Sequence, residues 1–309
     1  MLRSLLCLLA AVPILSAQAH LILDTDIGND VDDALALGMI HGFESRAEAR
    51  LLAVTITKDN RYAAPFVSLV NTFYGRPEIP IGVVHDGKTP EDSPMLKIAP
   101  LQRGRTYPEA VALLTRILAH EGDGAVSIAQ IGFSTNLARL VATPAGRRLV
   151  QQKVKALYLM AGNFARPKPE YNVFTDAESF RDLMKNWPTP IIFSGFEIGL
   201  EIPFPYEAIA KNFRYAARHP IVDAYKLYVG KREDHPDWDS TAVLEAIRPD
   251  RGYFAFSEPG RVSLGEKNTT VFTRDPKGNC RYLILKPDRA GAIRELIATL
   301  VSEPPERRQ

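Results

Sequence analysis

Short apolar segments alternate with helical patterns along most of this 309-residue chain, and this alternation constrains the fold more than any other feature. Apolar runs that are typical of buried strands are followed by segments with the 3.6-residue spacing of helices. Strands that alternate with helices favour a parallel sheet covered by helices on both faces. The expected strands span residues 20–24, 51–57, 79–84, 125–129, 154–160 and 190–194, and the expected helices span 31–40, 64–74, 108–120 and 176–186, with another after residue 135.

The last third of the chain has a different pattern. Helical spacing over residues 206–229 and 239–247 is followed by short strand-like runs between residues 253 and 286, and then by a closing helix near Arg289. We interpret these runs as an antiparallel extension of the same domain, because no Pro-, Gly- or Ser-rich linker precedes them. The sequence therefore predicts one α/β domain over residues 20–309 with a mainly parallel, open sheet that is Rossmann-like.

The first 19 residues differ in composition from the rest. Arg3 precedes an apolar run over residues 5–15, and Ala17 and Ala19 stand at the positions of an A-x-A cleavage site. This pattern is typical of a signal peptide, and the run is shorter than the about 20 apolar residues of a transmembrane helix. We expect residues 1–19 to be removed and the protein to be secreted or periplasmic, with no membrane attachment afterwards.

Charge and cysteine content narrow the class of partner. The chain has 38 Lys and Arg against 36 Asp and Glu, a formal charge of +2, so it lacks the basic footprint of a nucleic-acid-binding protein. Only Cys280 follows the signal peptide, which excludes an intrachain disulfide and suggests neither a zinc cluster nor a cysteine–histidine pair. The expected partner is a small molecule.

Polar loops follow four of the expected strands at their carboxyl ends. In open parallel sheets, ligands bind at this edge of the sheet. The four loops are therefore expected to converge on one rim and to form a binding site there. They span residues 24–33, 58–60, 130–136 and 161–172.

Five aspartates stand within ten positions of the first of these loops. They are Asp24, Asp26, Asp30, Asp32 and Asp33. Carboxylates at this density repel one another, and an unpaired buried carboxylate is costly. Gly28 allows a turn, and Asn29 or Asp30 can cap the helix that follows, which accounts for one or two of the five. The others predict a hard cation, for which calcium fits best because it accepts six to eight oxygen ligands; magnesium is the alternative.

The DxD pair at Asp24 and Asp26 occurs in two other classes of enzyme. Haloacid-dehalogenase-type phosphatases carry such a pair after a strand, but usually with Thr or Val two residues later, where this chain has Gly28. Metal-dependent glycosyltransferases also use a DxD pair, for which a bare DxD is a weak signal. The remaining motifs decide between these interpretations.

Residues 21–37, LILDTDIGNDVDDALAL, resemble the signature DxDPGxDDAxAL of the inosine–uridine-preferring nucleoside hydrolases, with two extra residues before the last Asp pair. The resemblance continues in order through LLAVTITKDN, IGFSTNLA, LYLMAGNF, PEYNVFTDAE and DWDSTAVLEAIRPD, and covers nearly the whole chain after the signal peptide. It implies the nucleoside hydrolase fold with calcium at the bottom of the pocket. The implied activity is hydrolysis of the N-glycosidic bond of ribonucleosides to free base and ribose.

The motif match implies a role for each of several residues. The implied calcium ligands are the carboxylates of Asp26, Asp33 and Asp239 and the backbone carbonyl of Ile131. The implied sugar-binding residues are Asp32, Asn60, Glu170 and Asn172, with Asn163 as a looser candidate. Asp26 would also be the general base, Asp24 would orient the loop from behind, and Asp30 would cap the helix.

One departure concerns the leaving group. Familiar members of the family carry a His before the last calcium-binding Asp, and this chain has Trp238 there. An indole can stack on a base or wall the pocket, but it cannot act as an acid. His235 could substitute, and Glu197 is a second candidate whose alternative role is to support the site or cap a helix.

Three functions are therefore considered. The first is a calcium-dependent ribonucleoside hydrolase that is exported and serves purine and pyrimidine salvage. The second is a hydrolase of another N-riboside, such as a nicotinamide riboside-like compound. The third is a non-catalytic nucleoside- or sugar-binding protein that has kept the metal site. Resemblance to the family also suggests a homo-oligomer, either a dimer or a tetramer.

Overall fold

The computed structural model describes residues 18–102 and 104–306. The predicted signal peptide over residues 1–19 lies almost entirely outside the described residues, so its removal stays a prediction. None of the described helices is both long enough and apolar enough to cross a membrane.

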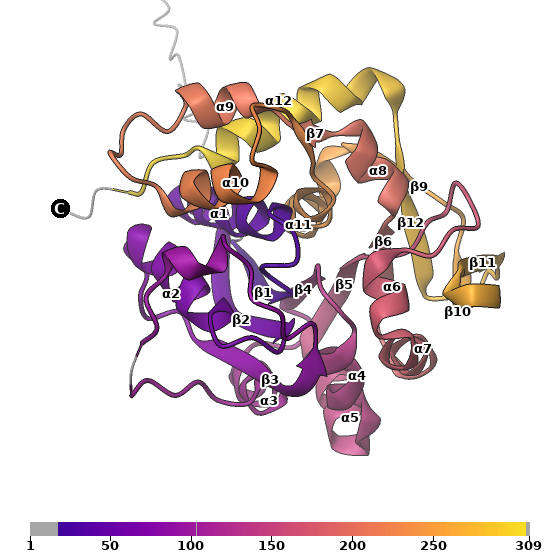
Figure 1. The fold of residues 1–309 in the computed structure, drawn as a ribbon. Coiled ribbons are helices and arrows are strands. Elements are labelled where there is room, and N and C mark those ends of the chain that lie inside the picture. The colour runs from indigo at the N-terminus through magenta and orange to yellow at the C-terminus, as the bar shows by residue number, and fades with distance from the viewer. Residues whose placement is uncertain (1–17, 103, 307–309) are drawn as a thin grey trace, which may run out of the picture.

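A single large sheet runs through the molecule (Figure 1), with strands in the order β11-β10-β12-β6-β5-β4-β1-β2-β3 and with β9 paired to β12. The strands from β3 to β12 in this order are parallel, and β9, β10 and β11 add antiparallel pairs at one end. The strand bounds are β1 Ala19–Thr25, β2 Ala49–Lys58, β3 Ile81–Lys88, β4 Val126–Gln130, β5 Val154–Met160, β6 Ile191–Ser194, β9 Phe254–Phe256, β10 Gly260–Leu264, β11 Thr270–Arg274 and β12 Cys280–Leu285. The predicted α/β domain with a mainly parallel sheet and a small antiparallel extension is confirmed.

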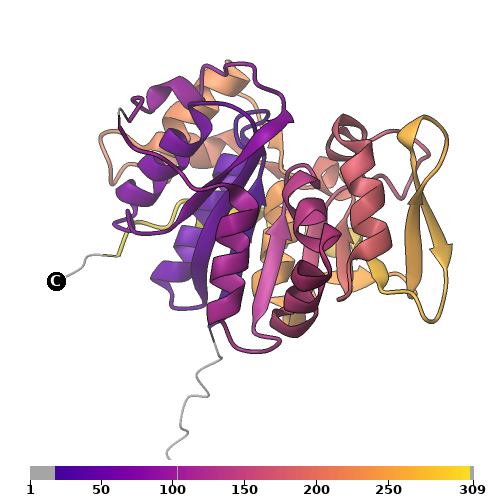
Figure 2. The same ribbon diagram turned by 90° about the horizontal axis from the view of Figure 1, so that it is seen from below.

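Helices cover both faces of this sheet, and the β10–β11 hairpin lies at the end of the sheet opposite β3 (Figure 2). One face carries α1 Asp32–Ser45, α2 Ala63–Phe73, α10 Pro220–Val229, α11 Asp239–Ile247 and α12 Ala290–Val301. The other face carries α3 Ala110–His120, α4 Thr135–Ala142, α5 Pro144–Lys153 and α7 Ala177–Asn186. The short elements are α6 Tyr171–Thr175, α8 Phe196–Glu201, α9 Tyr206–Lys211, and a separate two-stranded sheet of β7 Pro203–Phe204 and β8 His235–Pro236.

The first strand shows why the sheet needs this double cover. Leu21, Ile22 and Leu23 are all fully buried. Side chains alternate between the two faces of a strand, and accordingly Leu21 and Leu23 belong to one hydrophobic core while Ile22 belongs to the other. A continuous apolar run is therefore the pattern expected of a strand that is buried on both faces.

Helical spacing was expected over residues 206–229. The segment forms α9 and α10 with a break between them. His219 caps α10 by accepting a hydrogen bond from the backbone N–H of Ile221, and Pro220 occupies the first turn. Because proline lacks an N–H and clashes with the preceding turn, it begins a helix more readily than it continues one.

The first helix was expected over residues 31–40, but α1 continues through Gly42 to Ser45. A Cβ atom at Gly42 would lie 2.2 Å from the carbonyl oxygen of Leu300. Gly42 therefore allows the backbones of α1 and α12 to approach closely, and it does not end the helix.

Gly42→Ala is expected to lower the free energy of unfolding by about 1–3 kcal/mol, because the added methyl group overpacks the contact between α1 and α12. Gly291→Ala is the matched control. Gly291 lies in α12, the helix that Gly42 contacts, and a Cβ atom at Gly291 would meet nothing within 4 Å. The control should be neutral or stabilising by up to about 1 kcal/mol. Urea denaturation measures both changes, and equal stability of the two variants would contradict this account of Gly42.

Candidate active site

The strand order reverses direction between β1 and β4, which are adjacent in the sheet. The chain leaves β1 towards β2 on one side and leaves β4 towards β5 on the other. The loops therefore diverge and open a crevice at the carboxyl ends of these strands, where open α/β sheets bind their ligands.

A pocket of about 280 Å³ lies at this point. Its volume is close to the lower end of the range for small-molecule sites. Loops after β1, β4, β5 and β6 contribute to it, together with α10 and the start of α11. The lining residues are Asp26, Asn29, Asp30, Asp32, Asp33, Ile131, Met160, Glu170, Tyr171, Asn172, Phe196, Tyr228, Trp238 and Asp239.

The aspartate-rich loop turns at Gly28, whose φ of +107° favours glycine. The helix α1 begins at Asp32, and its N-cap is Val31, which makes no side-chain capping bond. Contrary to expectation, neither Asn29 nor Asp30 is the N-cap of this helix. Both side chains line the pocket, and Asp30 Oδ1 also accepts from the backbone N–H of Val31 at 2.5 Å. Asp32 and Asp33 occupy the first turn, where the partial positive charge of the helix terminus favours carboxylates.

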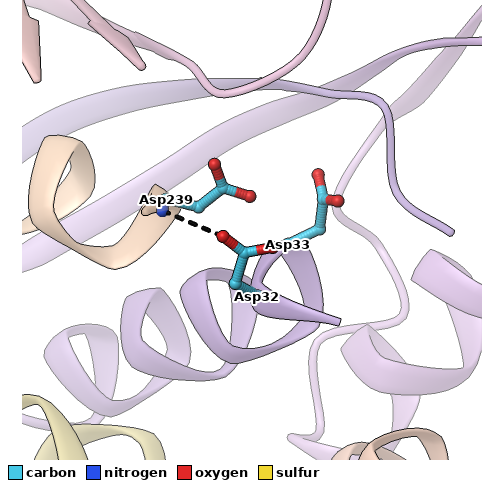
Figure 3. A group of neighbouring side chains, drawn as sticks. All are labelled: Asp32, Asp33 and Asp239. Atoms are coloured by element: carbon cyan, nitrogen blue, oxygen red, sulfur yellow. Dashed lines mark hydrogen bonds between the residues drawn. The ribbon is translucent and has the colours of Figure 1, made fainter. Parts of the chain in front are cut away.

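Asp32, Asp33 and Asp239 come together from the first turns of α1 and α11 (Figure 3). Each offers one carboxylate oxygen, and these oxygens all lie within 4.8 Å of one another. Asp32 Oδ2 accepts hydrogen bonds from the backbone N–H groups of Trp238 (3.0 Å) and Asp239 (3.3 Å). The hydroxyl of Thr25 donates to Asp33 Oδ1. Backbone and side-chain donors therefore hold the carboxylates of Asp32 and Asp33 in place.

Burial and mutual repulsion make this group unfavourable without a cation. All three side chains are buried. Burial raises the pKa of Asp32, of Asp33 and of Asp239 well above the ordinary value, and neighbouring carboxylates raise it further. Converging carboxylate oxygens are the donor set that hard divalent cations prefer, so these residues fit a metal ion.

Asp26 lines the same pocket beside this group. Burial raises the pKa of Asp26 to about 6, while a hydrogen bond from Asn29 and the charge of Lys58 oppose the rise. Asn29 Nδ2 donates to Asp26 Oδ2 at 2.8 Å. The charge of Asp26 also raises the pKa of Asp33, so the two carboxylates repel each other across the pocket. A carboxylate with a pKa near neutrality is suited to accept a proton.

The opposite side of the pocket is built around Glu170 and Asn172. Glu170 caps α6 by accepting hydrogen bonds from the N–H groups of Asn172 (2.8 Å) and Val173 (3.2 Å), and it also accepts from Gly162 (3.0 Å). Burial raises the pKa of Glu170 to about 7. The Asn172 amide donates to the carbonyl of Ile131 at 2.9 Å, which joins the loops after β4 and β5.

Aromatic rings form the remaining wall. Trp238 stacks on Phe196 with a centroid distance of 5.4 Å and an interplanar angle of 20°. The indole Nε1 donates to the carbonyl of Phe196 at 2.9 Å, which fixes the orientation of the ring. Tyr171 and Tyr228 line the same pocket. These rings offer flat apolar surfaces to a planar ligand.

Four of the residues expected at the site, and the candidate His235, are not among those that line the pocket. Asp24 lies behind it and accepts from Thr55 and Asn136. The Asn60 amide is bound to the carbonyls of Pro90 and Glu91 and to Asp92. Asn163 accepts from the N–H of Arg166, and Glu197 accepts from the N–H of Phe164.

His235 Nε2 lies 3.6 Å from Asp30 Oδ1, and its ring lies 6.2 Å from that of Trp238. His235 is therefore near the edge of the pocket rather than in its lining.

The sequence reasoning missed several lining residues, including Asn29, Tyr171, Phe196 and Tyr228. Phe196 stands two residues after the end of β6, so the rule that ligands bind at the carboxyl ends of strands could have found it. Tyr228 lies near the end of α10, where an apolar pattern is equally typical of a residue that packs in the core.

Comparison with known proteins agrees with this geometry. The model of the inosine-uridine preferring nucleoside hydrolase family matches residues 21–288. The chain belongs to this family of N-glycosyl hydrolases, which confirms the predicted family and enzyme class. No curated protein matches the chain in sequence.

Solved structures share the fold at low sequence identity. A plant nucleoside hydrolase is 19% identical, with 94% of this chain and 99% of that chain covered and a TM-score of 0.68. A purine-preferring ribonucleoside hydrolase from Gardnerella vaginalis is 18% identical over 93% of this chain and 99% of that chain, with a TM-score of 0.71. An inosine-uridine preferring nucleoside hydrolase from Bacillus anthracis is 18% identical over 92% and 100%, with a TM-score of 0.67.

The raised pKa values determine how the stability of the metal-free protein depends on pH. The pKa of Asp24 is about 7, that of Asp26 about 6 and that of Glu170 about 7, each above its ordinary value. Between about pH 4 and pH 7 the folded chain therefore binds more protons than the unfolded chain. Stability should fall as the pH rises through this window.

The midpoint of thermal unfolding in chelator is expected to be lower at pH 7.5 than at pH 5, and added calcium should raise it more at pH 7.5. A cation at 100-fold excess over its Kd adds about 2.7 kcal/mol of stability. Scanning calorimetry with and without calcium measures both effects, and Asp33→Asn should lose most of the response. A calcium effect of equal size at the two pH values would contradict the electrostatic account.

Proposed function

We propose that this protein is a calcium-dependent hydrolase that cleaves the N-glycosidic bond of ribonucleosides and releases free base and ribose. The observation that carries the proposal is the convergence in one pocket of a three-carboxylate group, a separate carboxylate at Asp26 and a polar face at Glu170 and Asn172. Membership of the nucleoside hydrolase family supports the same reaction.

The metal would be held by the group of Asp32, Asp33 and Asp239, with Asp26 and the Ile131 carbonyl beside it. Calcium, when bound, would hold sugar hydroxyls and lower the pKa of water. The sequence assigned Asp26 in place of Asp32 to the ligand set. Asp32 joins the group because the backbone N–H groups at the start of α11 donate to its carboxylate.

In the proposed reaction, Asp26 accepts a proton from the attacking water. Asn29 engages Oδ2 of this carboxylate, so the proton would go to Oδ1. The water oxygen forms a bond to C1′ while the bond between C1′ and the base nitrogen breaks. The electron pair of the broken bond leaves with the base, which takes a proton from solvent. In the transition state the sugar resembles an oxocarbenium ion, whose positive charge the surrounding carboxylates favour.

Glu170 and Asn172 would bind sugar hydroxyls. Hydrogen bonds from three N–H groups position the Glu170 carboxylate, which retains a further acceptor site. The amide nitrogen of Asn172 is used by the backbone carbonyls of Ile131 and Met160, so its Oδ1 is the atom that would accept from a hydroxyl.

The aromatic wall would receive the base. Trp238 and Phe196 are stacked on each other, and a planar base can pack against this pair. Among the described residues that line the pocket there is no His, so the lining supplies no imidazole to the leaving base. Burial and nearby carboxylates raise the pKa of Tyr228, which keeps its phenol protonated, and the phenol hydrogen-bonds to Asp30.

A panel of purine and pyrimidine ribonucleosides and nicotinamide riboside, with chromatography of the released bases, tests the proposal. At least one ribonucleoside should yield base and ribose, and removal of calcium should abolish turnover. If nicotinamide riboside is the only compound hydrolysed, the alternative function, hydrolysis of another N-riboside, is favoured. Tight binding of a nucleoside without product over hours would favour the non-catalytic reading.

Asp26→Asn is expected to lower kcat by at least about 100-fold, which is the usual contribution of a general base. Asp182→Asn is the control, because Asp182 is exposed on α7 away from the pocket. Steady-state kinetics with the best substrate of the panel measures the change. Unchanged turnover of Asp26→Asn with calcium still bound would rule out this base.

We further propose, on the pattern of residues 1–19, that the protein is exported and has a role in nucleoside salvage. Detection of the mature protein in a periplasmic or culture fraction, with an N-terminus near His20, would support export.

A further inference from the structure

Lys58 is a buried lysine at the carboxyl end of β2, next to the aspartate-rich loop. Its exposed fraction is 3%. Burial lowers the pKa of Lys58, while the charges of Asp26, Glu91 and Asp33 act in the opposite direction. Burying an ammonium group is costly unless hydrogen bonds and opposite charges compensate. The hydrogen-bond acceptors of Lys58 therefore indicate which groups this lysine positions.

Lys58 Nζ donates to two acceptors on different loops. The first is Asn29 Oδ1 at 2.7 Å, and the second is the backbone carbonyl of Thr89 at 2.6 Å. Thr89 follows β3 directly, and Asn29 follows β1, so one ammonium group joins the ends of three adjacent strands.

The ammonium group also decides which way the Asn29 amide points. Lysine donates hydrogen bonds and accepts none, so the oxygen of the amide must face Lys58. The nitrogen then faces away and donates to Asp26 Oδ2 at 2.8 Å and to the hydroxyl of Thr89 at 3.1 Å. A reversed amide would place two donors against each other and an oxygen against a carboxylate.

We propose that Lys58 is a positioning residue for the reaction: through Asn29 it fixes the orientation of the Asp26 carboxylate. This inference rests on the proposed function of Asp26 as the base. Lys58 itself is not among the residues that line the pocket, so it acts through Asn29 and not on the substrate.

The longer loop between Gly28 and Asp32 gives the arrangement a structural origin. Asn29, Asp30 and Val31 occupy the place of a single residue in the usual family signature. Asn29 belongs to this lengthened part, and it reaches both Lys58 and Asp26. The longer loop supplies Asn29, and the buried lysine orients it, so the two features act together on Asp26.

Kinetics of Lys58→Met and Asn29→Ala, both loaded with calcium, test the proposal. Each variant should lower kcat about 10- to 100-fold while KM stays within about threefold, because a misplaced base slows the chemical step without removing contacts to the sugar. The double variant should be no slower than the slower single variant, since both changes break the same chain of contacts.

Lys97→Met is the matched control. Lys97 is half-exposed and pairs with Asp92 at 3.0 Å, in the segment that follows Thr89. Its kcat should stay within twofold of the wild type. A kcat within threefold of the wild type for Lys58→Met, a rise in KM alone, or full additivity in the double variant would overturn the proposal.

An NMR measurement is independent of turnover. The side-chain amide signals of Asn29, assigned by their loss in Asn29→Asp, should shift and exchange faster with solvent in Lys58→Met than in the wild type. Unchanged amide signals in Lys58→Met would overturn the proposal. If no ribonucleoside is hydrolysed by the wild type, the proposed function fails, and these signals still decide whether Lys58 orients Asn29.

Discussion

Repulsion among buried carboxylates is the constraint around which the site is organised. Asp32, Asp33 and Asp239 are held close together although the charge of Asp33 raises the pKa of Asp32, and the charges of both raise the pKa of Asp239. Two helix N-termini offset part of this repulsion, because Asp32 lies in the first turn of α1 and accepts backbone N–H groups from the first turn of α11. Lys58 adds a positive charge on the side of Asp26. The remaining imbalance is what makes the site fit a cation.

Much of the fold could be predicted because its strands are buried on both faces. A strand such as β1 must be apolar at every position, and this makes it visible in the sequence. Once the strands are placed, the rule that their carboxyl ends converge brings together Asp26, Ile131 and Glu170 from three separate loops, as the pocket shows. Runs of apolar residues and the positions of loops are both local properties of the sequence. They can therefore be predicted without knowledge of side-chain contacts.

The details of the site could not be predicted in this way, because they depend on which partner captures each side chain. Asn60 and Lys58 are two residues apart after the same strand. The carbonyls of Pro90 and Glu91 hold the Asn60 amide away from the pocket lining, whereas Lys58 reaches Asn29 beside Asp26. The conformation of the loop after β3 determines which of the two side chains reaches the site. Neither Asn60 nor Lys58 alone encodes that conformation.

The hydrogen bond between Asp239 and Asp32 joins residues 207 positions apart in the chain. The three-carboxylate group therefore exists only after α11 has docked against α1. A cation that needs all three carboxylates would recognise the completed fold and have little affinity for a partly folded chain. A ligand that binds the native state alone stabilises it by mass action. The metal would thus stabilise the contact between two helices that lie far apart in the sequence.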